Sequence, residues 1–353
     1  MKIAIIISHP EMGGAQRVSL NLVEWLQNSA SYEASIIALS HLEKGAYDMT
    51  RYDYHYLKSK IKVLELRKLL KSLSPDVVLT MGVPLCLYTI PATIGLHLKH
   101  IVSERNDPSH FAGKKSTALV SRLLMKHADG YVFQTNDAQA FYGGGIAKKS
   151  TVIPNPLFNI SKMPAAIYEE VREKSIVTVG RLNLQKNHIL LIDAFAAIAE
   201  EYPDYKLIIW GDGGERGKLE NYVKECKLEK KVILPGTSNK IFDHIYKSSL
   251  FILSSDFEGM PNALMEAMAL GLPVISTNCP CGGPSFLIKD GNNGILVPVG
   301  DKGKLLKAMK FMLDNPDRAK EMGQKAFYIR EQLSELSINQ KWLHYFKTIS
   351  AKQ

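Results

Sequence analysis

The chain repeats one pattern along most of its length: short runs of β-branched and aliphatic residues alternate with amphipathic segments of helical period. In the first half the apolar runs fall at 2–8, 34–39, 77–80, 100–103 and 130–134, with amphipathic segments at 14–26 and 61–73. Strands that alternate with helices form parallel β-α-β units, so this pattern predicts a doubly wound α/β sheet. Ligands bind to such sheets at the carboxyl ends of the strands.

The pattern stops at the segment Pro154-Asn155-Pro156 and then begins again. Two prolines stiffen the backbone there and prevent a helix from continuing. Beyond them we expect strands at 175–179, 206–210, 232–234, 250–254 and 273–276, and helices at 189–200, 215–226, 241–247 and 261–270. The last helical region, after about residue 305, has no strand behind it. We therefore predict an N-terminal domain over 1–160, a C-terminal domain over 161–335, and a final helix over 336–353.

Length and composition fit this two-domain prediction. The chain has 353 residues, more than an ordinary single domain, and an apolar fraction of 46% that supplies two cores. No run reaches the roughly 18 apolar residues that span a bilayer. The apolar run at 3–7 is short, as expected of a buried strand and not of a signal peptide. We therefore expect a cytoplasmic protein.

Cysteine and charge limit the classes of partner. The pair Cys279 and Cys281 lacks the second ligand pair that a metal site needs, so we expect no metal. The net charge is +9, and residues 1–165 carry 19 Lys and Arg against 12 Asp and Glu, whereas the remainder carries 25 against 23. A basic first half indicates an anionic partner: a phosphorylated substrate, an anionic membrane surface or nucleic acid.

A Gly13-Gly14 pair ends the first expected strand and opens the first expected helix. Two glycines let the backbone come close to a ligand, and the helix start presents unpaired amides with a partial positive charge. This arrangement suits a phosphate, although a simple turn fits the pair equally well. The spacing is not Gly-x-Gly-x-x-Gly, so the dinucleotide-binding fingerprint is absent.

The loop at 180–188 carries Arg181 and Lys186 next to another expected helix start. Two cations there could neutralise a diphosphate, because arginine supplies a planar fork of donors and lysine a mobile point charge. The alternative is two solvated surface charges.

The segment 257–266 has the most specific pattern, with Glu258 in a loop and Glu266 inside the helix that follows. We expect Pro261 at the first helical position. Carboxylates accept hydrogen bonds from sugar hydroxyls, and amides at the helix start bind phosphate. Because the helix is apolar nearly all round, we expect it to be buried, and Glu266 then needs a partner or a ligand.

Taken together, these motifs resemble those of the retaining group 1 (family 4) glycosyltransferases, and the resemblance covers nearly the whole chain. The motifs that carry it are Gly13-Gly14, Gly180-Arg181-x4-Lys186, Gly211-Asp212-Gly213, the run Glu258-Gly259-Met260-Pro261-Asn262, and Glu258-x7-Glu266. The resemblance implies the GT-B fold: two Rossmann-like doubly wound domains that face each other across a deep cleft, with a C-terminal helix that crosses back to the first domain.

The resemblance also implies roles for single residues. Arg181 and Lys186 would bind the donor diphosphate, Glu258 the hydroxyls of the donor sugar, and Glu266 the ribose. The remaining donor-binding positions that it implies are Gly13, Gly14, Gly211, Gly213, Phe257, Gly259, Met260 and Asn262. Many members carry a histidine that faces the sugar, and Arg105 stands at that place here, so we count it with the catalytic residues.

The activity implied by the resemblance is transfer of a hexose or N-acetylhexosamine from a nucleotide diphosphate sugar, with UDP favoured, with retention and with neither metal nor cofactor. The basic first domain would face the acceptor. Its cations are Lys58, Lys60, Lys62, Arg67, Lys68, Lys71, Lys114, Lys115, Arg122 and Lys126. They are either solvated helix faces or a docking site for the anionic inner leaflet and a lipid diphosphate. The latter predicts a lipid-linked glycan as acceptor.

Three other classes remain as alternatives. A sugar-nucleotide epimerase of the same fold would convert its donor without an acceptor. A dehydrogenase would need a nicotinamide cofactor, and its fingerprint is absent. A nucleic-acid-binding protein would account for the charge, but no segment resembles a reading helix or an aromatic-studded sheet, so we expect no nucleic acid.

Overall fold

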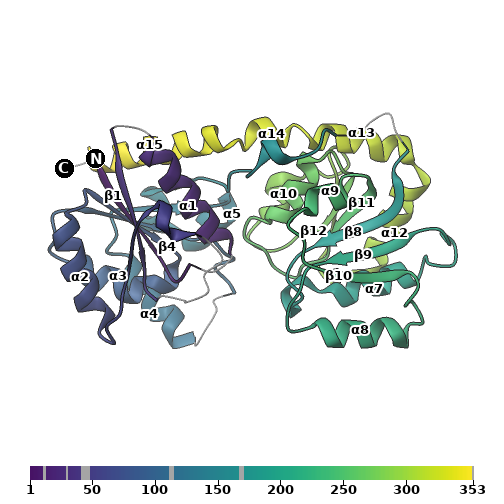
Figure 1. Cartoon of the computed structure of the whole chain (residues 1–353), viewed down its shortest axis with the longest axis horizontal. Coiled ribbons are helices and arrows are strands. Elements are labelled where there is room, and N and C mark those ends of the chain that lie inside the picture. The colour runs from purple at the N-terminus through teal and green to yellow at the C-terminus, as the bar shows by residue number, and fades with distance from the viewer. Residues whose placement is uncertain (11–12, 29–30, 41–47, 111–114, 167–170, 352–353) are drawn as a thin grey trace. The chain divides into compact units, whose positions relative to one another are not determined.

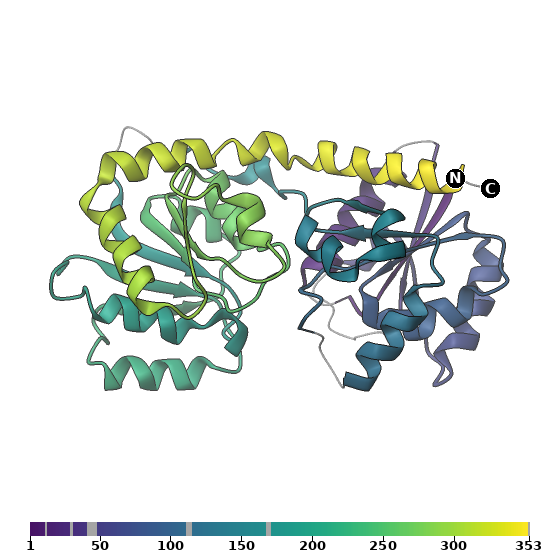
Figure 2. The ribbon, with the colours of Figure 1, turned by 180° about the vertical axis from the view of Figure 1, so that it is seen from behind.

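A computed structural model describes residues 1–10, 13–28, 31–40, 48–110, 115–166 and 171–351. The chain divides into two compact units (Figure 1). Unit 1 combines Met1–Pro156 with the C-terminal segment Glu335–Gln353, and unit 2 is Leu157–Ser334. The two ends of the described chain lie close together in unit 1, where the Ser350 hydroxyl donates to the Met1 sulfur at 3.7 Å (Figure 2).

Unit 1 is built on a seven-stranded sheet in which every strand pairs in parallel with its neighbours. The strands are β1 (Lys2–Ile7), β2 (Glu33–Ala38), β3 (Asp53–Tyr56), β4 (Val77–Met81), β5 (Lys99–Ser103), β6 (Gly130–Phe133) and β7 (Ser150–Val152). Their order is β3-β2-β1-β4-β5-β6-β7. The chain therefore moves outward in one direction from β1 and in the other from β4, and the boundary between these two strands is the topological switch point.

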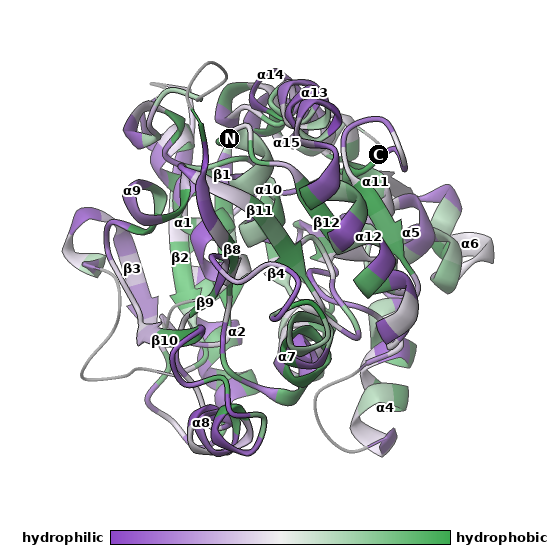
Figure 3. Ribbon diagram, turned by 90° about the vertical axis from the view of Figure 1, so that its right-hand side faces the viewer, coloured by the Kyte–Doolittle hydropathy of each residue, from purple (hydrophilic) through white to green (hydrophobic). Residues whose placement is uncertain are grey.

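Helices and short 3₁₀ turns connect the strands of unit 1. They are α1 (Gly14–Gln27), η1 (Met49–Arg51), α2 (Lys62–Leu73), η2 (Val83–Leu85), α3 (Cys86–Thr93), α4 (Lys115–Met125), α5 (Asn136–Tyr142) and α6 (Gly144–Lys148). The C-terminal helix α15 (Glu335–Ser350) also belongs to this unit and follows the last strand of the described chain. One core cluster packs Ala4, Ile6 and Ile37 of the sheet against Leu66 and Leu70 of α2. The strands are apolar along most of their length, as β2 illustrates in Figure 3, because both faces of a parallel sheet are covered.

Helix α15 is tied into unit 1 by buried hydrogen bonds. The Tyr345 hydroxyl accepts from the Tyr131 amide at 2.9 Å and donates to the Lys149 carbonyl at 2.7 Å. Gly130 leaves room for this hydroxyl, since a Cβ there would lie 2.5 Å from it. Trp342 and Phe346 are fully buried on the same helix.

Unit 2 is built on a six-stranded parallel sheet with the order β10-β9-β8-β11-β12-β13. The strands are β8 (Glu173–Val179), β9 (Lys206–Trp210), β10 (Val232–Gly236), β11 (Ser248–Leu253), β12 (Val274–Thr277) and β13 (Ile295–Val297). The helical segments are η3 (Ile160–Lys162), η4 (Leu184–Lys186), α7 (His188–Ala196), α8 (Arg216–Glu225), α9 (Ile241–Ile245), α10 (Asn262–Ala269), α11 (Gly283–Leu287), α12 (Lys302–Asp314), α13 (Pro316–Ala326) and α14 (Ile329–Gln332). Its switch point lies between β8 and β11.

The sequence prediction of two doubly wound α/β sheets is confirmed. Three strands that the sequence analysis left out are also present: β3 and β7 at the two edges of the first sheet, and β13 at an edge of the second. Edge strands are short and half-covered, so they lack the apolar run that identifies a central strand. Among the described residues, no helix combines the length and apolar character needed to cross a bilayer.

Candidate functional site

The two loops with the most specific sequence motifs lie side by side in unit 2. The loop with Arg181 and Lys186 follows β8, and the loop with Glu258 follows β11; these strands are neighbours in the sheet. The connection is direct, because the Asp256 amide donates to the Gln185 carbonyl at 2.8 Å. Both loops therefore meet at the switch point, where open parallel sheets bind their ligands.

An ion pair between Lys186 and Glu258 joins these loops. The lysine Nζ lies 2.5 Å from Oε1 of Glu258, and the side chains are only 17% and 8% exposed. The Ser255 hydroxyl donates to the same carboxylate oxygen at 2.6 Å. A carboxylate this well covered is stable only with such donors around it, because desolvation of a charge without partners is costly.

A second set of contacts holds the backbone on both sides of this pair. The Ser254 hydroxyl donates to the Lys186 carbonyl at 2.9 Å, and the Asn187 side-chain amide donates to Asp256 at 2.7 Å. Asn187 has a left-handed φ of 44°, a conformation that asparagine tolerates, and its side chain caps α7 by accepting from the Leu190 amide. Neither Ser254 nor Asn187 was predicted as a site residue; Ser254 ends the predicted strand 250–254, and Asn187 precedes the predicted helix 189–200 by two residues.

Two glycines let neighbouring loops approach backbone to backbone. Gly211 follows β9 with φ of 138°, and a Cβ there would lie 1.8 Å from the Gly180 carbonyl oxygen. Gly283 opens α11, and a Cβ there would lie 1.7 Å from the carbonyl oxygen of Gly259. The turn with Gly211 and Gly213 thus abuts the Arg181 loop, and the start of α11 abuts the Glu258 loop.

Helix α10 differs from its prediction in two respects. It begins at Asn262 with Pro261 at the N-cap, one residue later than expected. Glu266 is half-buried, as are Asn262 and Ala263, so α10 has an outward side and is not buried all round. Asn262 and Glu266 both lie on this outward side, one turn apart, because four residues of helix rise by about 6 Å.

The other predicted donor positions of unit 2 lie around the ion pair. Phe257 is half-buried, whereas Gly259 and Met260 are buried between the pair and the start of α10. Arg181 is exposed after β8 and takes part in no ion pair with the described residues. At the end of β9, the Trp210 ring stacks on His244, with centroids 4.7 Å apart and planes at 16° to each other. This aromatic pair was not among the predicted site residues.

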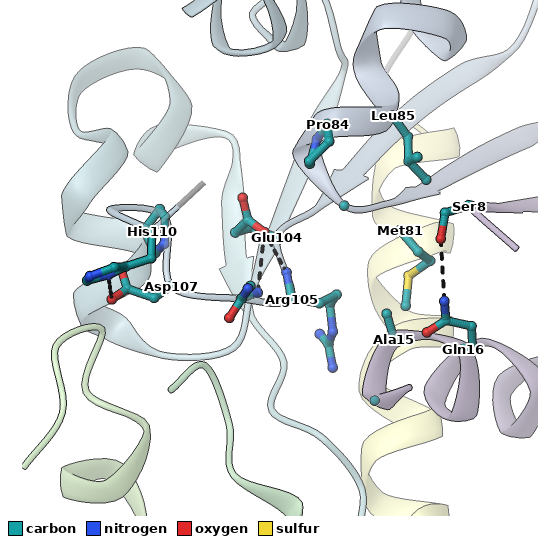
Figure 4. A pocket seen from close by; sticks show the side chains of 14 residues that line it. Ser8, Ala15, Gln16, Met81, Pro84, Leu85, Glu104, Arg105, Asp107 and His110 are labelled. Carbon is teal, nitrogen blue, oxygen red and sulfur yellow. Dashed lines mark hydrogen bonds and ion pairs between the residues drawn. The ribbon is translucent and has the colours of Figure 1, made fainter. Parts of the chain in front are cut away.

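A separate pocket of about 390 Å³ opens at the switch point of unit 1 (Figure 4). It lies where β1, β4 and β5 end, as expected for a doubly wound sheet. Its lining residues are Ser8, Gly14, Ala15, Gln16, Met81, Gly82, Pro84, Leu85, Glu104, Arg105, Asn106, Asp107, Pro108 and His110. Gly14 is the first residue of α1, and Gly13 is its N-cap with an extended φ of −169° that any residue can adopt. Met12, the residue before this pair, lies outside the described part of the chain.

Arg105 belongs to this pocket and also to the frame of unit 1. Its guanidinium donates to the Ile153 carbonyl at 3.3 Å and to the Asn155 side chain, and it lies 6.0 Å from the Trp342 ring centre. Burial lowers the pKa of Arg105 to about 9, and the nearby Glu104 acts in the opposite direction.

Two buried carboxylates shape the loop beyond β5. Glu104 accepts from the amides of Arg105 and Asn106 and from the Tyr142 hydroxyl, and burial raises the pKa of this carboxyl. Asp107 accepts from Ser109 and pairs with Nδ1 of His110 at 2.8 Å. Of this polar run only Arg105 was predicted as a site residue, and Glu104 and Asp107 were not. The signal for the other two is that polar residues directly after a buried parallel strand tend to line a site.

Comparisons with known proteins agree with this architecture. Residues 160–327 match the family model described as glycosyl transferases group 1. The chain is 27% identical to an N-acetylgalactosamine-N,N'-diacetylbacillosaminyl-diphospho-undecaprenol 4-alpha-N-acetylgalactosaminyltransferase of Campylobacter jejuni, over 98% of this chain and 99% of that protein. It is also 27% identical to a UDP-Gal:alpha-D-GlcNAc-diphosphoundecaprenol alpha-1,3-galactosyltransferase of Escherichia coli, over 89% and 88% of the two chains.

The fold has close counterparts among solved structures. A crystal structure of HepE from Anabaena, described as a complex with UDP, aligns with a TM-score of 0.84 over 99% of this chain and 100% of that one, at 19% identity. The fold is therefore that of the GT-B glycosyltransferases. Residues 160–327 form a group 1 glycosyltransferase domain.

The ion pair predicts a specific pattern of stability. Lys186→Gln removes the cation and leaves Glu258 covered without a charge partner, so the free energy of unfolding should fall by about 2 to 3 kcal/mol. The double variant Lys186→Met/Glu258→Leu removes both charges and should recover most of this loss. Urea unfolding measures both values.

A matched control is the exposed pair Lys310–Glu201, whose atoms lie 2.6 Å apart with 38% and 51% exposed side chains. Lys310→Gln should cost less than about 1 kcal/mol. If Lys186→Gln and Lys310→Gln have equal effects, the account of the covered pair is wrong.

Proposed function

We propose that the chain is a retaining, metal-independent glycosyltransferase that moves a hexose or N-acetylhexosamine from a UDP-sugar to a lipid-diphosphate-linked glycan. The observation that carries this proposal is the covered Lys186–Glu258 pair at the switch point of unit 2, within the domain that matches the family model. A cation and a carboxylate held 2.5 Å apart, next to a helix start, offer one group to a phosphate and one to a sugar hydroxyl.

The donor site follows from these positions. Lys186 and Arg181 contact the diphosphate, one as a point charge and one as a planar fork. The amides of Gly259, Met260 and Asn262 at the start of α10 add donors and the positive end of a helix. When the donor enters, its diphosphate replaces Glu258 as the partner of Lys186, and the released carboxylate accepts from a sugar hydroxyl.

The outward side of α10 fits the nucleoside. Glu266 is half-buried one turn beyond Asn262, where its carboxylate accepts from the ribose hydroxyls. Gly211 and Gly213 lie near the base, in the turn that abuts the Arg181 loop. Uracil is the favoured base because the Escherichia coli relative is named as a transferase of UDP-Gal.

The chemistry needs charge stabilisation more than a strong base. The bond between the anomeric carbon and the diphosphate oxygen breaks, and negative charge grows on that oxygen. Lys186, Arg181 and the α10 amides stabilise this charge, the task that a metal ion performs in other transferases. The acceptor oxygen bonds to the anomeric carbon on the same face, and its proton passes to the departing diphosphate.

The acceptor belongs to the basic unit 1. Its pocket of about 390 Å³ at the switch point offers carboxylate, guanidinium and imidazole groups to a glycan. Arg105 lines this pocket and takes the place at which many members carry a sugar-facing histidine. A lipid-linked acceptor is favoured because both curated relatives are named for diphospho-undecaprenol substrates. The enzyme then works at the cytoplasmic face of a membrane, as a peripheral protein in the assembly of a surface polysaccharide or of glycoprotein glycans.

Nucleotide binding tests the donor class. Thermal shift is measured with UDP, GDP, ADP, UDP-hexoses, UDP-N-acetylhexosamines and NAD. We expect stabilisation by UDP and one UDP-sugar. In Glu266→Ala, which lacks the ribose contacts, the affinity for UDP derived from the shift at increasing UDP concentrations should be at least tenfold weaker. Stabilisation by NAD alone would point to the dehydrogenase class instead.

Product analysis tests the reaction. The preferred UDP-sugar is incubated with a synthetic short-chain polyprenyl diphosphate that carries N-acetylglucosamine, in EDTA. We expect a transfer product whose anomeric proton shows the same α configuration as the donor in NMR spectra. A β product contradicts retention, a loss of activity in EDTA contradicts metal independence, and donor conversion without acceptor indicates an epimerase.

A further inference from the structure

Three helices form one continuous layer on unit 1. Helix α2 contacts α3, and α3 contacts α4, so the segments 57–73, 83–96 and 115–127 lie in a row (Figure 1). The two groups of cations in the sequence, which lie more than forty residues apart, therefore belong to the same face of the unit. We call this face the α2–α4 face.

The α2–α4 face exposes large apolar side chains. Of the described residues in unit 1, the exposed large hydrophobic ones are Ile61, Leu64, Tyr88, Ile94, Leu119, Val120, Leu123, Phe141 and Leu336. Seven of these described residues lie on the α2–α4 face. Phe141 adjoins this face, because the guanidinium of Arg122 lies 5.1 Å from the centre of the Phe141 ring. Of the nine, only Leu336 lies elsewhere, on α15. Scattered apolar residues need no explanation, but a gathered set marks a contact surface.

The same face is strongly basic. Its three segments hold nine Lys and Arg residues against the single acidic residue Glu65. Glu65 is engaged locally, since its carboxylate accepts from the amides of Lys58 and Ser59. Nearly the whole net charge of +9 is thus concentrated on one face. Lys114, which the sequence analysis included in this group, lies outside the described residues.

Helix α4 shows the arrangement most clearly. Ala118, Ser121 and Met125 face the unit, and Leu119 and Leu123 stand on the opposite side with 61% and 50% of their surfaces exposed. Exposed Lys115 and Lys126 flank that apolar stripe, and α4 has no acidic residue. A helix with an outward apolar stripe between cations is the kind that lies in the interface of an anionic bilayer.

We propose that the α2–α4 face docks on an anionic phospholipid bilayer, with Leu119 and Leu123 entering the headgroup region and Lys115 and Lys126 pairing with lipid phosphates. Charge selects this occupant. A second copy of the chain would bring nine cations against nine, whereas an anionic leaflet attracts each cation near its surface. This proposal rests on the proposed function in that a lipid-linked acceptor requires such a position.

Vesicle co-sedimentation tests the docking. The full chain is incubated with vesicles of phosphatidylcholine alone or of equal parts phosphatidylcholine and phosphatidylglycerol. We expect binding to the anionic vesicles only. The double variant Lys115→Gln/Lys126→Gln should weaken it by about twentyfold, and Leu119→Ser/Leu123→Ser by about tenfold.

Helix α15 supplies matched controls on another face of the same unit. Leu336→Ser and Lys341→Gln/Lys347→Gln make the same chemical changes at exposed positions and should leave vesicle binding unchanged. Equal losses in the α4 and α15 variants, unaltered binding in the α4 variants, or no preference for anionic vesicles would each overturn the proposal.

A second readout separates this proposal from the proposed function. Stabilisation by UDP reports on unit 2, and every α4 and α15 variant should keep the wild-type response. Vesicle binding that depends on α4 in a chain that ignores UDP would support the docking face and contradict the donor site. UDP binding without vesicle binding would support the donor site and contradict the docking face.

Discussion

The covered ion pair between Lys186 and Glu258 is the interaction on which the candidate donor site depends. Its two charges are 72 positions apart in the chain, yet they lie 2.5 Å apart because β8 and β11 are neighbours in the sheet. The pair satisfies two charged groups that would otherwise be desolvated without a partner. It also keeps both side chains in place. A ligand that carries a phosphate and hydroxyls can then replace the contact between them, because both side chains are already oriented toward the ligand.

The doubly wound topology places such groups without help from local sequence. In each unit the chain moves outward from one strand in both directions, and the loops at that switch point open at the carboxyl ends of adjacent strands. Unit 2 gathers the loops with Lys186 and Glu258 there, and unit 1 forms a pocket with Glu104, Arg105 and Asp107. Backbone contacts at Gly211 and Gly283 then bring further loops to the rim of the site in unit 2.

The sequence allowed prediction of the two sheets, their central strands and the loops that meet in unit 2, because apolar runs and glycines report local structure directly. The edge strands β3, β7 and β13 were missed since their residues are few and partly exposed. The ion pair itself could not be foreseen: the motifs suggested a ligand for each charge, and only strand order shows that the two charges first bind each other. The polar loop after β5 and the apolar stripe of α4 depend on which sides of their segments face inward, which the periodicity of short segments does not settle.

The most direct measurement of the central claim is a crystal structure of the chain with UDP. The account predicts diphosphate oxygens within hydrogen-bond distance of Lys186 Nζ, the ribose hydroxyls against the Glu266 carboxylate, and Glu258 released from its lysine. UDP bound away from the switch point of unit 2, with the Lys186–Glu258 pair intact and the ribose far from α10, would contradict it.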